Sequence, residues 1–237
     1  MKYEKIAKGK FISRPNRFVA IVDIDGAPTK VHVKNTGRCR ELLIPGATVY
    51  LEDYHERMGK RKMRYSLVGV EKARENDTLM INMDSQAPNK VVREAFENNA
   101  IVLPDFGSIA KVKWEHQYGA SRVDFYLENK SGNKALVEVK GVTLEDNNIA
   151  RFPDAPTERG IKHIHELEHA LSDGYYTAIL FVIQMQGMAL MKPNDETHLA
   201  FGDALRHAAH LGVHVLAYDS IVTHDELNID KPIPVKL

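Results

Sequence analysis

One uninterrupted apolar run constrains the fold of this chain more than any other part of its sequence. The stretch YYTAILFVIQM, residues 175–185, contains no charged residue and is rich in β-branched and aromatic side chains. Such a run, without alternation, is typical of a strand buried on both faces of a sheet. A helix pattern precedes it, because apolar residues recur every three to four positions from the N-cap Thr157 to Leu171, and Gly174 ends the helix. The chain is therefore predicted to build an α/β layer.

The rest of the second part of the chain fits around this strand. A helix is predicted from an N-cap at Asn89, and a later helix runs from about Thr197 to Leu211. Strand patterns cover residues 109–118, 122–128, 134–140 and 213–217. The resulting order of helix, three strands, helix, strand, helix and strand is an α/β arrangement.

The first part of the chain has a different pattern, with short strands, frequent turns and no helical period of useful length. Strand patterns cover residues 17–24, 29–33, about 47–53, 64–71 and 79–83. About five short strands fit a small β-barrel, and the OB-fold, a common nucleic-acid-binding architecture, is one such barrel. We therefore predict two domains, an OB-like barrel over residues 1–82 and an α/β domain over residues 83–237.

Charge divides the chain near the same place. The whole chain has 32 basic and 32 acidic side chains, but residues 1–75 contain 17 basic against 9 acidic, which leaves 15 basic and 23 acidic in the remainder. A basic segment beside an acidic one suggests that the barrel meets a polyanion. Solvated charge that clusters without function is the alternative. The residues expected to contact nucleic acid from the barrel are Arg14, Arg17, Lys34, Arg38, Arg40, Arg61, Lys62 and Arg64.

The hairpin SRVDFYLENKSGNKALVEVKG, residues 121–141, carries charges in an apolar setting. Side chains alternate along a strand, so Glu138 and Lys140 point the same way, and Asp124 on the partner strand can approach Glu138. Two adjacent carboxylates repel unless a cation lies between them, and Mg²⁺ takes oxygen ligands. The pattern therefore predicts a site for metal-dependent phosphodiester cleavage, in which Lys140 orients the attacking water or neutralises the phosphate.

Two further residues support this interpretation, and one simpler interpretation competes with it. Glu94, on the preceding helix, is placed to complete an acidic cluster, and Gly141 allows a ligand to come close. Alternatively, acid-x-Lys is an ordinary charge pair on an exposed strand face, and Glu94 is a solvated helix residue. The helix sequence FPDAPTERGIKHIHEL adds Arg159, Lys162 and His163 on one face, where they can contact a phosphate or are simply solvated.

These motifs together resemble a known family. NTGRCRELLIPG, SRVDFYL, VEVKGVTL and FPDAPTERGIKHIHEL are similar over the whole chain to the sugar fermentation stimulation protein A (SfsA) family, within the PD-(D/E)XK or restriction-endonuclease-like superfamily. The resemblance implies an OB-like domain followed by an αβββαβ nuclease-like domain with a mixed central sheet. It also implies DNA binding and a link to maltose metabolism. By the superfamily pattern Asp124 and Glu138 are metal ligands, Lys140 is the catalytic lysine and Glu94 is the helix-borne acid. The residue before Asp124 is Val123, where the superfamily name has proline.

Several classes of protein are excluded or disfavoured. No apolar run reaches the length of a membrane span, the N-terminus is not a secretory signal, and the single Cys39 rules out an internal disulfide, so we expect a cytoplasmic protein. Neither GxxxxGK[ST] nor GxGxxG occurs, which argues against a nucleotide cofactor. Oligomeric state is left open, and a homodimer is among the states allowed.

Three functions therefore stay open. The first is a DNA-binding nuclease that uses Mg²⁺ or Mn²⁺. The second is a DNA-binding regulator of sugar metabolism that keeps the nuclease fold without cutting. The third is an RNA-processing factor, because OB-folds accept single strands of either kind.

Overall fold

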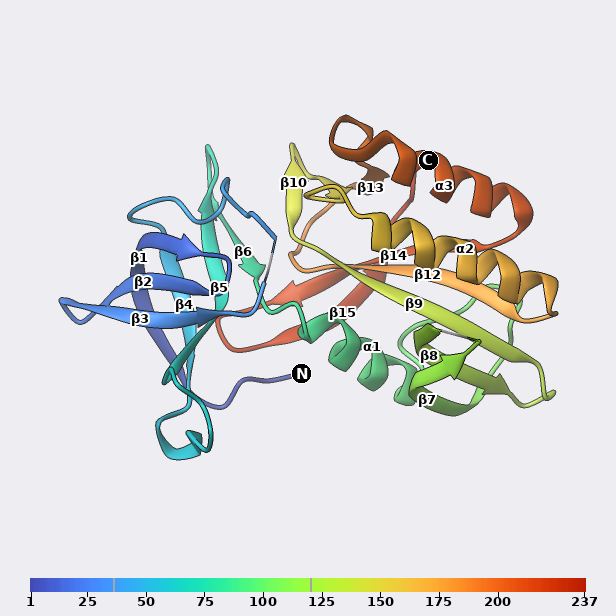
Figure 1. The fold of residues 1–237 in the computed structure, drawn as a ribbon, viewed down its shortest axis with the longest axis horizontal. Coiled ribbons are helices and arrows are strands. Elements are labelled where there is room, and N and C mark those ends of the chain that lie inside the picture. The colour runs from blue at the N-terminus through green and yellow to red at the C-terminus, as the bar shows by residue number, and fades with distance from the viewer. Residues whose placement is uncertain (36, 120) are drawn as a thin grey trace.

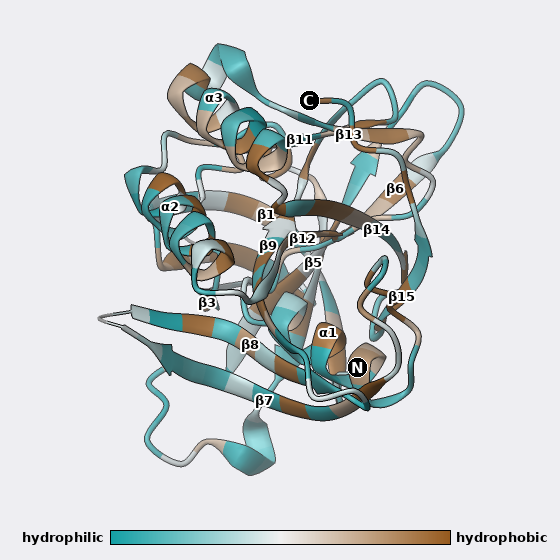
Figure 2. Ribbon diagram, turned by 90° about the vertical axis from the view of Figure 1, so that its right-hand side faces the viewer, coloured by the Kyte–Doolittle hydropathy of each residue, from teal (hydrophilic) through white to brown (hydrophobic). Residues whose placement is uncertain are grey.

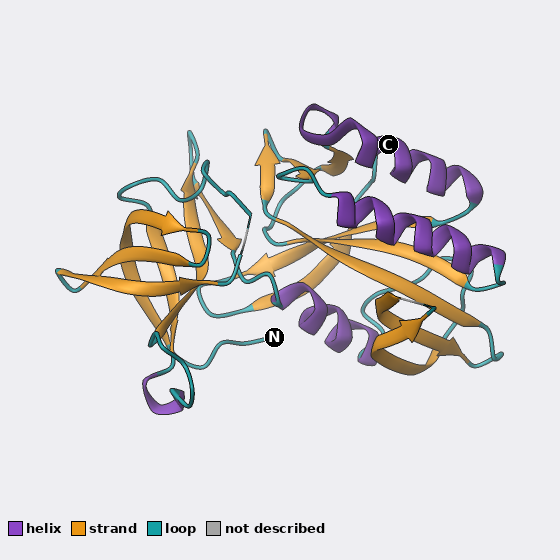
Figure 3. Cartoon of the chain, in the orientation of Figure 1, coloured by secondary structure: helices purple, strands orange, loops and turns teal. Residues whose placement is uncertain are grey.

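A β-barrel and a layered α/β unit lie side by side in the computed structural model and are joined near residues 82–86 (Figure 1). The structure describes residues 1–35, 37–119 and 121–237. The three α-helices belong to the second unit, whereas the barrel carries only the short 3₁₀ helix η1 (His55–Arg57) (Figure 3). The chain begins on the second unit, because the Tyr3 N–H donates to the Asp225 carbonyl at 2.8 Å.

The barrel consists of β1 (Ile6–Asn16), β2 (Val19–Ile24), β3 (Ala27–Val33), β4 (Thr48–Asp53) and β5 (Tyr65–Ala73). Neighbouring strands follow the order β3-β2-β1-β4-β5, and parallel pairing of β3 with β5 closes the ring. A sixth strand, β6 (Thr78–Asn82), pairs with β5 outside the ring. The closed five-stranded, OB-like barrel predicted from the sequence is thus confirmed.

The membership of the ring differs from the prediction at one strand. β1 belongs to the ring although its sequence did not predict a strand, and the predicted strand at 79–83 is β6, which lies outside it. Only Gly9 and Phe11 of the eleven residues of β1 are buried, so its alternation is weak. Gly9 is required by close packing, since a Cβ there would lie 2.5 Å from Val22 and 2.7 Å from the Asp23 carbonyl.

The second unit is built on a mixed six-stranded sheet of order β15-β14-β12-β9-β8-β7. Its strands are β7 (Ile109–Tyr118), β8 (Ser121–Asn129), β9 (Lys134–Val142), β12 (Tyr176–Ile183), β14 (His214–Val222) and β15 (Leu227–Pro232). β9, β12 and β14 are parallel, while β7, β8 and β15 pair antiparallel with their neighbours. A three-stranded sheet of β10 (Leu144–Asp146), β11 (Ile149–Phe152) and β13 (Leu190–Pro193) stands beside it. The predicted αβββαβ order is confirmed, with β10, β11, β13 and β15 as unpredicted additions.

Helices cover both faces of this sheet. α1 (Ala87–Glu97) lies on one face, and α2 (Glu158–Ser172) and α3 (Asp195–Leu211) lie on the other (Figure 1). The helices show bands of apolar and polar residues, as amphipathic helices do (Figure 2). β12 alternates between two cores: Ile179 and Phe181 pack in the α2–α3 core, and Leu180 packs in the α1 core. This double burial explains the uninterrupted apolar run and confirms the prediction made from it.

The two helix starts turned out differently. Thr157 caps α2, because its hydroxyl accepts the Gly160 N–H at 3.0 Å. The predicted N-cap at Asn89 is wrong, since α1 begins two residues earlier, at Ala87, with Gln86 as N-cap. Pro88 occupies the first turn, a position where its missing N–H costs nothing, and Asn89 is left inside the helix.

The barrel and the second unit share an apolar core. Barrel residues such as Phe11 and Leu67 belong to the same buried cluster as Ile164 of α2 and Phe181 of β12. A shared core of this kind holds the two units in one relative orientation. It therefore sets where the loops of the barrel lie relative to the β8–β9 hairpin.

Candidate functional site

The β8–β9 hairpin brings two of the predicted ligands to facing positions. Phe125 pairs with Val137, so the next residues outward on the two strands are Asp124 and Glu138. Here a side chain replaces the backbone carbonyl as hydrogen-bond acceptor between the strands, because Asp124 Oδ2 accepts the Val139 N–H at 2.8 Å. Asp124 thus bridges the strands at the point where their regular pairing ends.

Glu138 lies in a cluster of nitrogen donors. Its side chain is 5% exposed, and its Oε1 accepts hydrogen bonds from Lys140 Nζ at 2.7 Å and from His163 of α2. Arg159 Nε donates to His163 Nε2 at 3.2 Å, which places the imidazole proton on Nδ1, facing Glu138. Burial opposes ionisation, but His163 and Lys140 outweigh it and hold the pKa of Glu138 below its usual value.

Asp124 has a different environment. Its Oδ1 accepts a hydrogen bond from the Asn89 side-chain amide at 2.8 Å, so the first turn of α1 orients this carboxylate. Burial, followed by the negative charge of Glu138, raises the pKa of Asp124, and the bonds from Val139 and Asn89 counteract this only in part. The sequence pattern predicts no role for Asn89 beyond helix capping. Its contact with Asp124 depends on how α1 packs on the sheet.

The structure does not bring Glu94 to this pair. Glu94 is half exposed and forms an ion pair with the Met1 ammonium group at 2.8 Å. Five residues separate it from Asn89, which turns the two side chains to different sides of α1. Across residues 1–35, 37–119 and 121–237, no three Asp, Glu, His or Cys side chains converge as a ready metal cage. The hairpin therefore offers two carboxylates, with Lys140 beside them.

Gly141 serves packing between the units. A Cβ at this position would collide with the Gln184 side chain and lie 2.7 Å from Pro88 Cγ. Gln184 in turn donates to the Asn82 carbonyl and to the Asp84 carbonyl, each at 3.1 Å. The expectation that Gly141 makes room for a ligand is wrong, because Gln184 and Pro88 fill that space.

Four of the predicted basic residues of the barrel have internal partners. The Lys34 side chain is 9% exposed and pairs with Asp84 at 2.6 Å. Arg64 forms two hydrogen bonds with Asp53, and Arg61 stacks on Tyr54 with its guanidinium carbon 3.6 Å from the ring centre. The fourth residue, Arg14, donates to four backbone carbonyls of residues 17, 35, 37 and 38.

The other predicted basic residues are exposed. Within the described residues, no carboxylate forms an ion pair with Arg17, Arg38, Arg40 or Lys62. On α2, Lys162 is exposed and lies 3.6 Å from Glu166, while Arg159 is exposed beside His163. Arg17, Arg38 and Arg40 gather with Arg14 around one pocket of the barrel. Sequence reasoning named these residues but could not separate the free cations from the paired ones.

Comparison with known proteins now identifies the family. A model described as the sugar fermentation stimulation protein RE domain matches residues 86–226, and one described as the SfsA N-terminal OB domain matches residues 12–81. The chain belongs to the SfsA family. A sugar fermentation stimulation protein homolog of Ruminiclostridium cellulolyticum is 50% identical over 237 residues and is covered completely, as is this chain. Another, from Clostridium acetobutylicum, is 45% identical over 239 residues, with both chains again fully covered.

A solved structure supports the same assignment. The SfsA of Pyrococcus furiosus, described in complex with Ca²⁺, matches with a TM-score of 0.86 and 27% identity, over 100% of this chain and 98% of that one. The restriction-endonuclease-like fold expected from the resemblance is therefore the fold of this SfsA chain. None of the helices in the described residues has the length and apolar character needed to cross a membrane.

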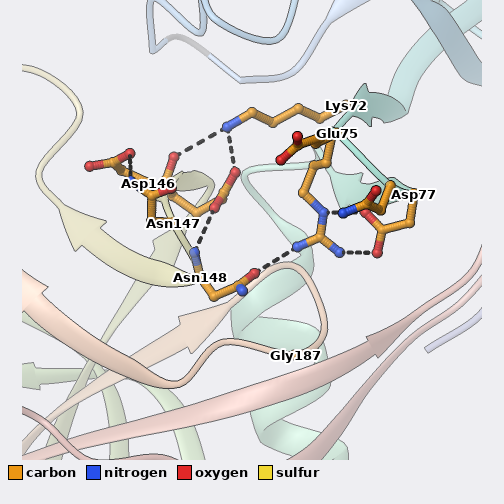
Figure 4. Close-up of a pocket in the computed structure, with 10 residues that line it drawn as sticks. Lys72, Glu75, Asp77, Asp146, Asn147, Asn148 and Gly187 are labelled. Carbon is orange, nitrogen blue, oxygen red and sulfur yellow. Dashed lines mark hydrogen bonds and ion pairs between the residues drawn. The ribbon is translucent and has the colours of Figure 1, made fainter.

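A polar cavity of about 550 Å³ lies elsewhere in this SfsA chain, between the β5–β6 turn of the barrel and the β10–β11 turn (Figure 4). Lys72 reaches across it to Glu145, and Arg74 is held between Asp77 and Asn148, each at 2.7 Å. Lys72 and Arg74 therefore already have partners within the protein. The cavity therefore acts as a polar bridge between the units and is separate from the hairpin carboxylates.

Proposed function

We propose that this SfsA chain is a nucleic-acid-binding phosphodiesterase that uses Mg²⁺ or Mn²⁺ at Asp124 and Glu138. The observation that carries the proposal is the pairing of the buried Glu138 carboxylate with the half-buried Asp124 carboxylate across the end of a hairpin, with Lys140 adjacent. Burial, followed by the negative charge of Glu138, raises the pKa of Asp124, and a divalent cation beside the pair would favour its ionised form. DNA is proposed as the first substrate because the family resemblance implies DNA binding.

The residues present fit a hard divalent cation. Mg²⁺ is commonly bound through one or two carboxylates, with waters and substrate phosphates completing its shell. Lys140 and His163 both bind Oε1 of Glu138, and no hydrogen bond to Oε2 occurs within the described residues. Oε2 is thus available as a ligand. The Ca²⁺ complex of the Pyrococcus furiosus relative supports a divalent cation in this family.

The surrounding residues of the chain would each have a defined task. When bound, the metal supplies a water of lowered pKa and stabilises negative charge on the phosphoryl group. Asn89 holds Asp124 in one orientation, and His163 does the same for Glu138. The Lys140 ammonium group lies on the same face and can orient the attacking water or meet the phosphate charge.

The test is cleavage of single- and double-stranded DNA and RNA with Mg²⁺ or Mn²⁺. Glu138→Gln and Lys140→Ala should abolish cleavage, and Glu138→Gln should also weaken Ca²⁺ binding measured by calorimetry. Glu94→Gln is the matched control, because it removes an acid that lies away from the pair. Cleavage by wild type that survives Glu138→Gln would overturn the proposed site. Loss of cleavage in Glu94→Gln would instead restore the predicted role of Glu94.

One observation favours a second function, a DNA-binding regulator without cleavage. The charge of Glu138 already has Lys140 as partner, so this part of the hairpin is satisfied without a metal. A protein of this kind would retain DNA on the barrel while leaving it intact with every metal offered. Cleavage of RNA alone would support the RNA-processing alternative.

A further inference from the structure

The barrel carries a pocket of about 300 Å³, and the described residues that line it include four arginines and no acid. Arg14, Arg17, Arg38 and Arg40 surround it together with Asn16, Gly37 and Leu43. Three of these guanidinium groups, those of Arg17, Arg38 and Arg40, are exposed and have no carboxylate partner among the described residues. Arginine presents several N–H donors in a planar fork that matches phosphate oxygens. Three neighbouring arginines without an ion-pair partner in the described part of the chain create a local excess of positive charge, which favours binding of an anionic ligand.

Arg14 connects the two segments that line the pocket. Its Nη1 donates to the carbonyls of Gly37 and Arg38 at 2.8 and 2.9 Å, and its Nη2 donates to the carbonyls of Arg17 and Asn35 at 2.8 and 2.7 Å. One side chain thus ties the turn that carries Arg17 to the loop that carries Arg38. These four bonds hold the carbonyls of residues 17, 35, 37 and 38 together before any ligand arrives, which lowers the entropic cost of binding.

An exposed aromatic ring, that of Phe18, lies next to Arg17 of the pocket. Phe18 is 44% exposed, and the guanidinium carbon of Arg17 lies 4.7 Å from its ring centre. The Phe18 N–H is held by the Asn16 side chain at 2.9 Å, so the turn beneath the ring is ordered by its own hydrogen bond. An aromatic ring beside a basic groove is the arrangement on which an unpaired base stacks.

The loop that carries Arg38 packs against the segment before α2, the helix whose His163 contacts Glu138 of the hairpin. A Cβ on Gly37 would overlap the Asp154 carboxylate, so the loop of Arg38 lies directly against the segment before α2. Thr157 starts that helix three residues later, and the helix carries Arg159 and His163. The charges of Arg14 and Arg38 act on the Asp154 carboxylate, although Asp154 forms no ion pair with either and is not among the described residues that line the pocket.

We propose that this pocket binds backbone phosphates of single-stranded nucleic acid, with an adjacent base stacked on Phe18. This inference rests on the proposed function and narrows its substrate to a strand with unpaired bases. Bases within a duplex are stacked on one another and cannot lie on Phe18. Arg17, Arg38 and Arg40 contact the phosphates, and Arg14 is a positioning residue.

Binding is tested without cleavage, in EDTA, by fluorescence anisotropy. The probes are oligo(dT) of about 12 nucleotides, a range that one OB-fold covers, an abasic oligomer with the same number of phosphates, and a duplex of equal phosphate count. Wild type should bind oligo(dT) more tightly than either of the others. Arg38→Gln/Arg40→Gln should weaken binding and reduce the slope of log K against log salt by about 1.4, since each lost phosphate contact contributes about 0.7.

Two further variants separate the parts of the pocket. Phe18→Ala should weaken oligo(dT) binding about 5- to 150-fold while leaving the abasic oligomer unchanged. Lys130→Gln/Lys134→Gln removes two exposed charges at the far turn of the β8–β9 hairpin and should leave the salt slope unchanged. Because Phe18, Arg38 and Arg40 are exposed, circular dichroism melts of the variants should match wild type.

The outcomes distinguish this inference from the proposed function. A pocket variant that binds with wild-type affinity and salt slope, or a duplex that binds wild type as tightly as oligo(dT), overturns the pocket. Absence of binding to any probe in EDTA also overturns it. Binding that follows the predictions while no metal supports cleavage upholds the pocket and rejects the nuclease.

Discussion

Replacing Lys34 with methionine is expected to destabilise the whole chain. Lys34 lies in the barrel and pairs with Asp84, at the junction of the two units, across 2.6 Å. Its ammonium group also lies 3.5 Å from Glu52. The side chain of Lys34 is 9% exposed and that of Asp84 is 0% exposed, so solvent screens this pair very little. Methionine would preserve the packing of the stem and leave Asp84 buried without its cation.

The magnitude follows from that burial. Removing one partner of a buried ion pair costs about 3–5 kcal/mol, because an uncompensated charge is left inside. For a chain of this size, about 1 kcal/mol corresponds to about 2–4 °C in Tm, so Lys34→Met should lower Tm by about 6–20 °C. Asp84 also accepts the Gln86 N–H at 2.9 Å, and Asn keeps that acceptor. Lys34→Met/Asp84→Asn should therefore recover at least about 2 kcal/mol of the loss.

The assay is urea unfolding followed by fluorescence, with calorimetry to check that unfolding is one transition. Lys30→Met, at an exposed position of β3, the strand that ends just before Lys34, is the control and should change the free energy of unfolding by less than about 0.5 kcal/mol. A loss below about 1 kcal/mol for Lys34→Met would refute the reasoning. So would a double variant that is no more stable than Lys34→Met.

The pH dependence of this effect has a definite sign. Burial disfavours the charged lysine, but Asp84 and its neighbours outweigh burial and raise the pKa of Lys34. A raised lysine pKa contributes stability that is fully present below the unfolded value and is lost as pH rises through the folded value. The difference between wild type and Lys34→Met should thus stay constant through neutral pH. It should shrink only in strongly alkaline solution.

Three further predictions test the surroundings of the hairpin and of α2. Asn89→Ala removes the hydrogen bond to Asp124 and should lower kcat/KM of cleavage about 10- to 100-fold, and unchanged kinetics would rule out the positioning role. Gly141→Ala should reduce the free energy of unfolding by about 1–3 kcal/mol because its Cβ collides with Gln184, and a neutral result in urea would mean that Gln184 yields freely. Thr157→Ala should cost about 1 kcal/mol of stability through the lost cap, Thr157→Ser should restore it, and equal melting curves for both would contradict the capping role.

Local sequence pattern predicted those elements whose burial is regular. β7, β9, α2 and β12 lie within a residue or two of their predicted bounds, because each has a strong period or an uninterrupted apolar run. Thr157 was recognised as a cap because capping depends on residues within one turn. β1 was not predicted because it is mostly exposed and its sequence lacks a clear strand alternation. It forms a strand because it pairs with its neighbours in the closed barrel.

Contacts between distant segments could not be predicted in the same way. Asp124 and Glu138 were paired correctly because a short hairpin fixes their register. Glu94 and Asn89 lie on a helix whose rotation depends on packing against the sheet, and the residue that reaches Asp124 is Asn89. From the sequence alone, Lys34 was predicted to be a surface cation that contacts nucleic acid. In the structure it pairs with the buried Asp84, which is 50 positions away in the chain. The role of a charged residue therefore depends on which distant segment lies opposite.

The two carboxylates of the hairpin differ in what balances their charge. Glu138 has the Lys140 ammonium group 2.7 Å away, whereas the hydrogen bonds to Asp124 within the described residues come from neutral donors, the amide of Asn89 and the N–H of Val139, each at 2.8 Å. A buried carboxylate without a cationic partner is costly to keep ionised. The charge of Lys140 favours the ionised form of Asp124, but burial and the charge of Glu138 outweigh it, so positive charge is in deficit on the Asp124 side of the hairpin. A self-contained ion pair would need only Glu138 and Lys140, so the presence of Asp124 beside them favours a hairpin built around a divalent cation.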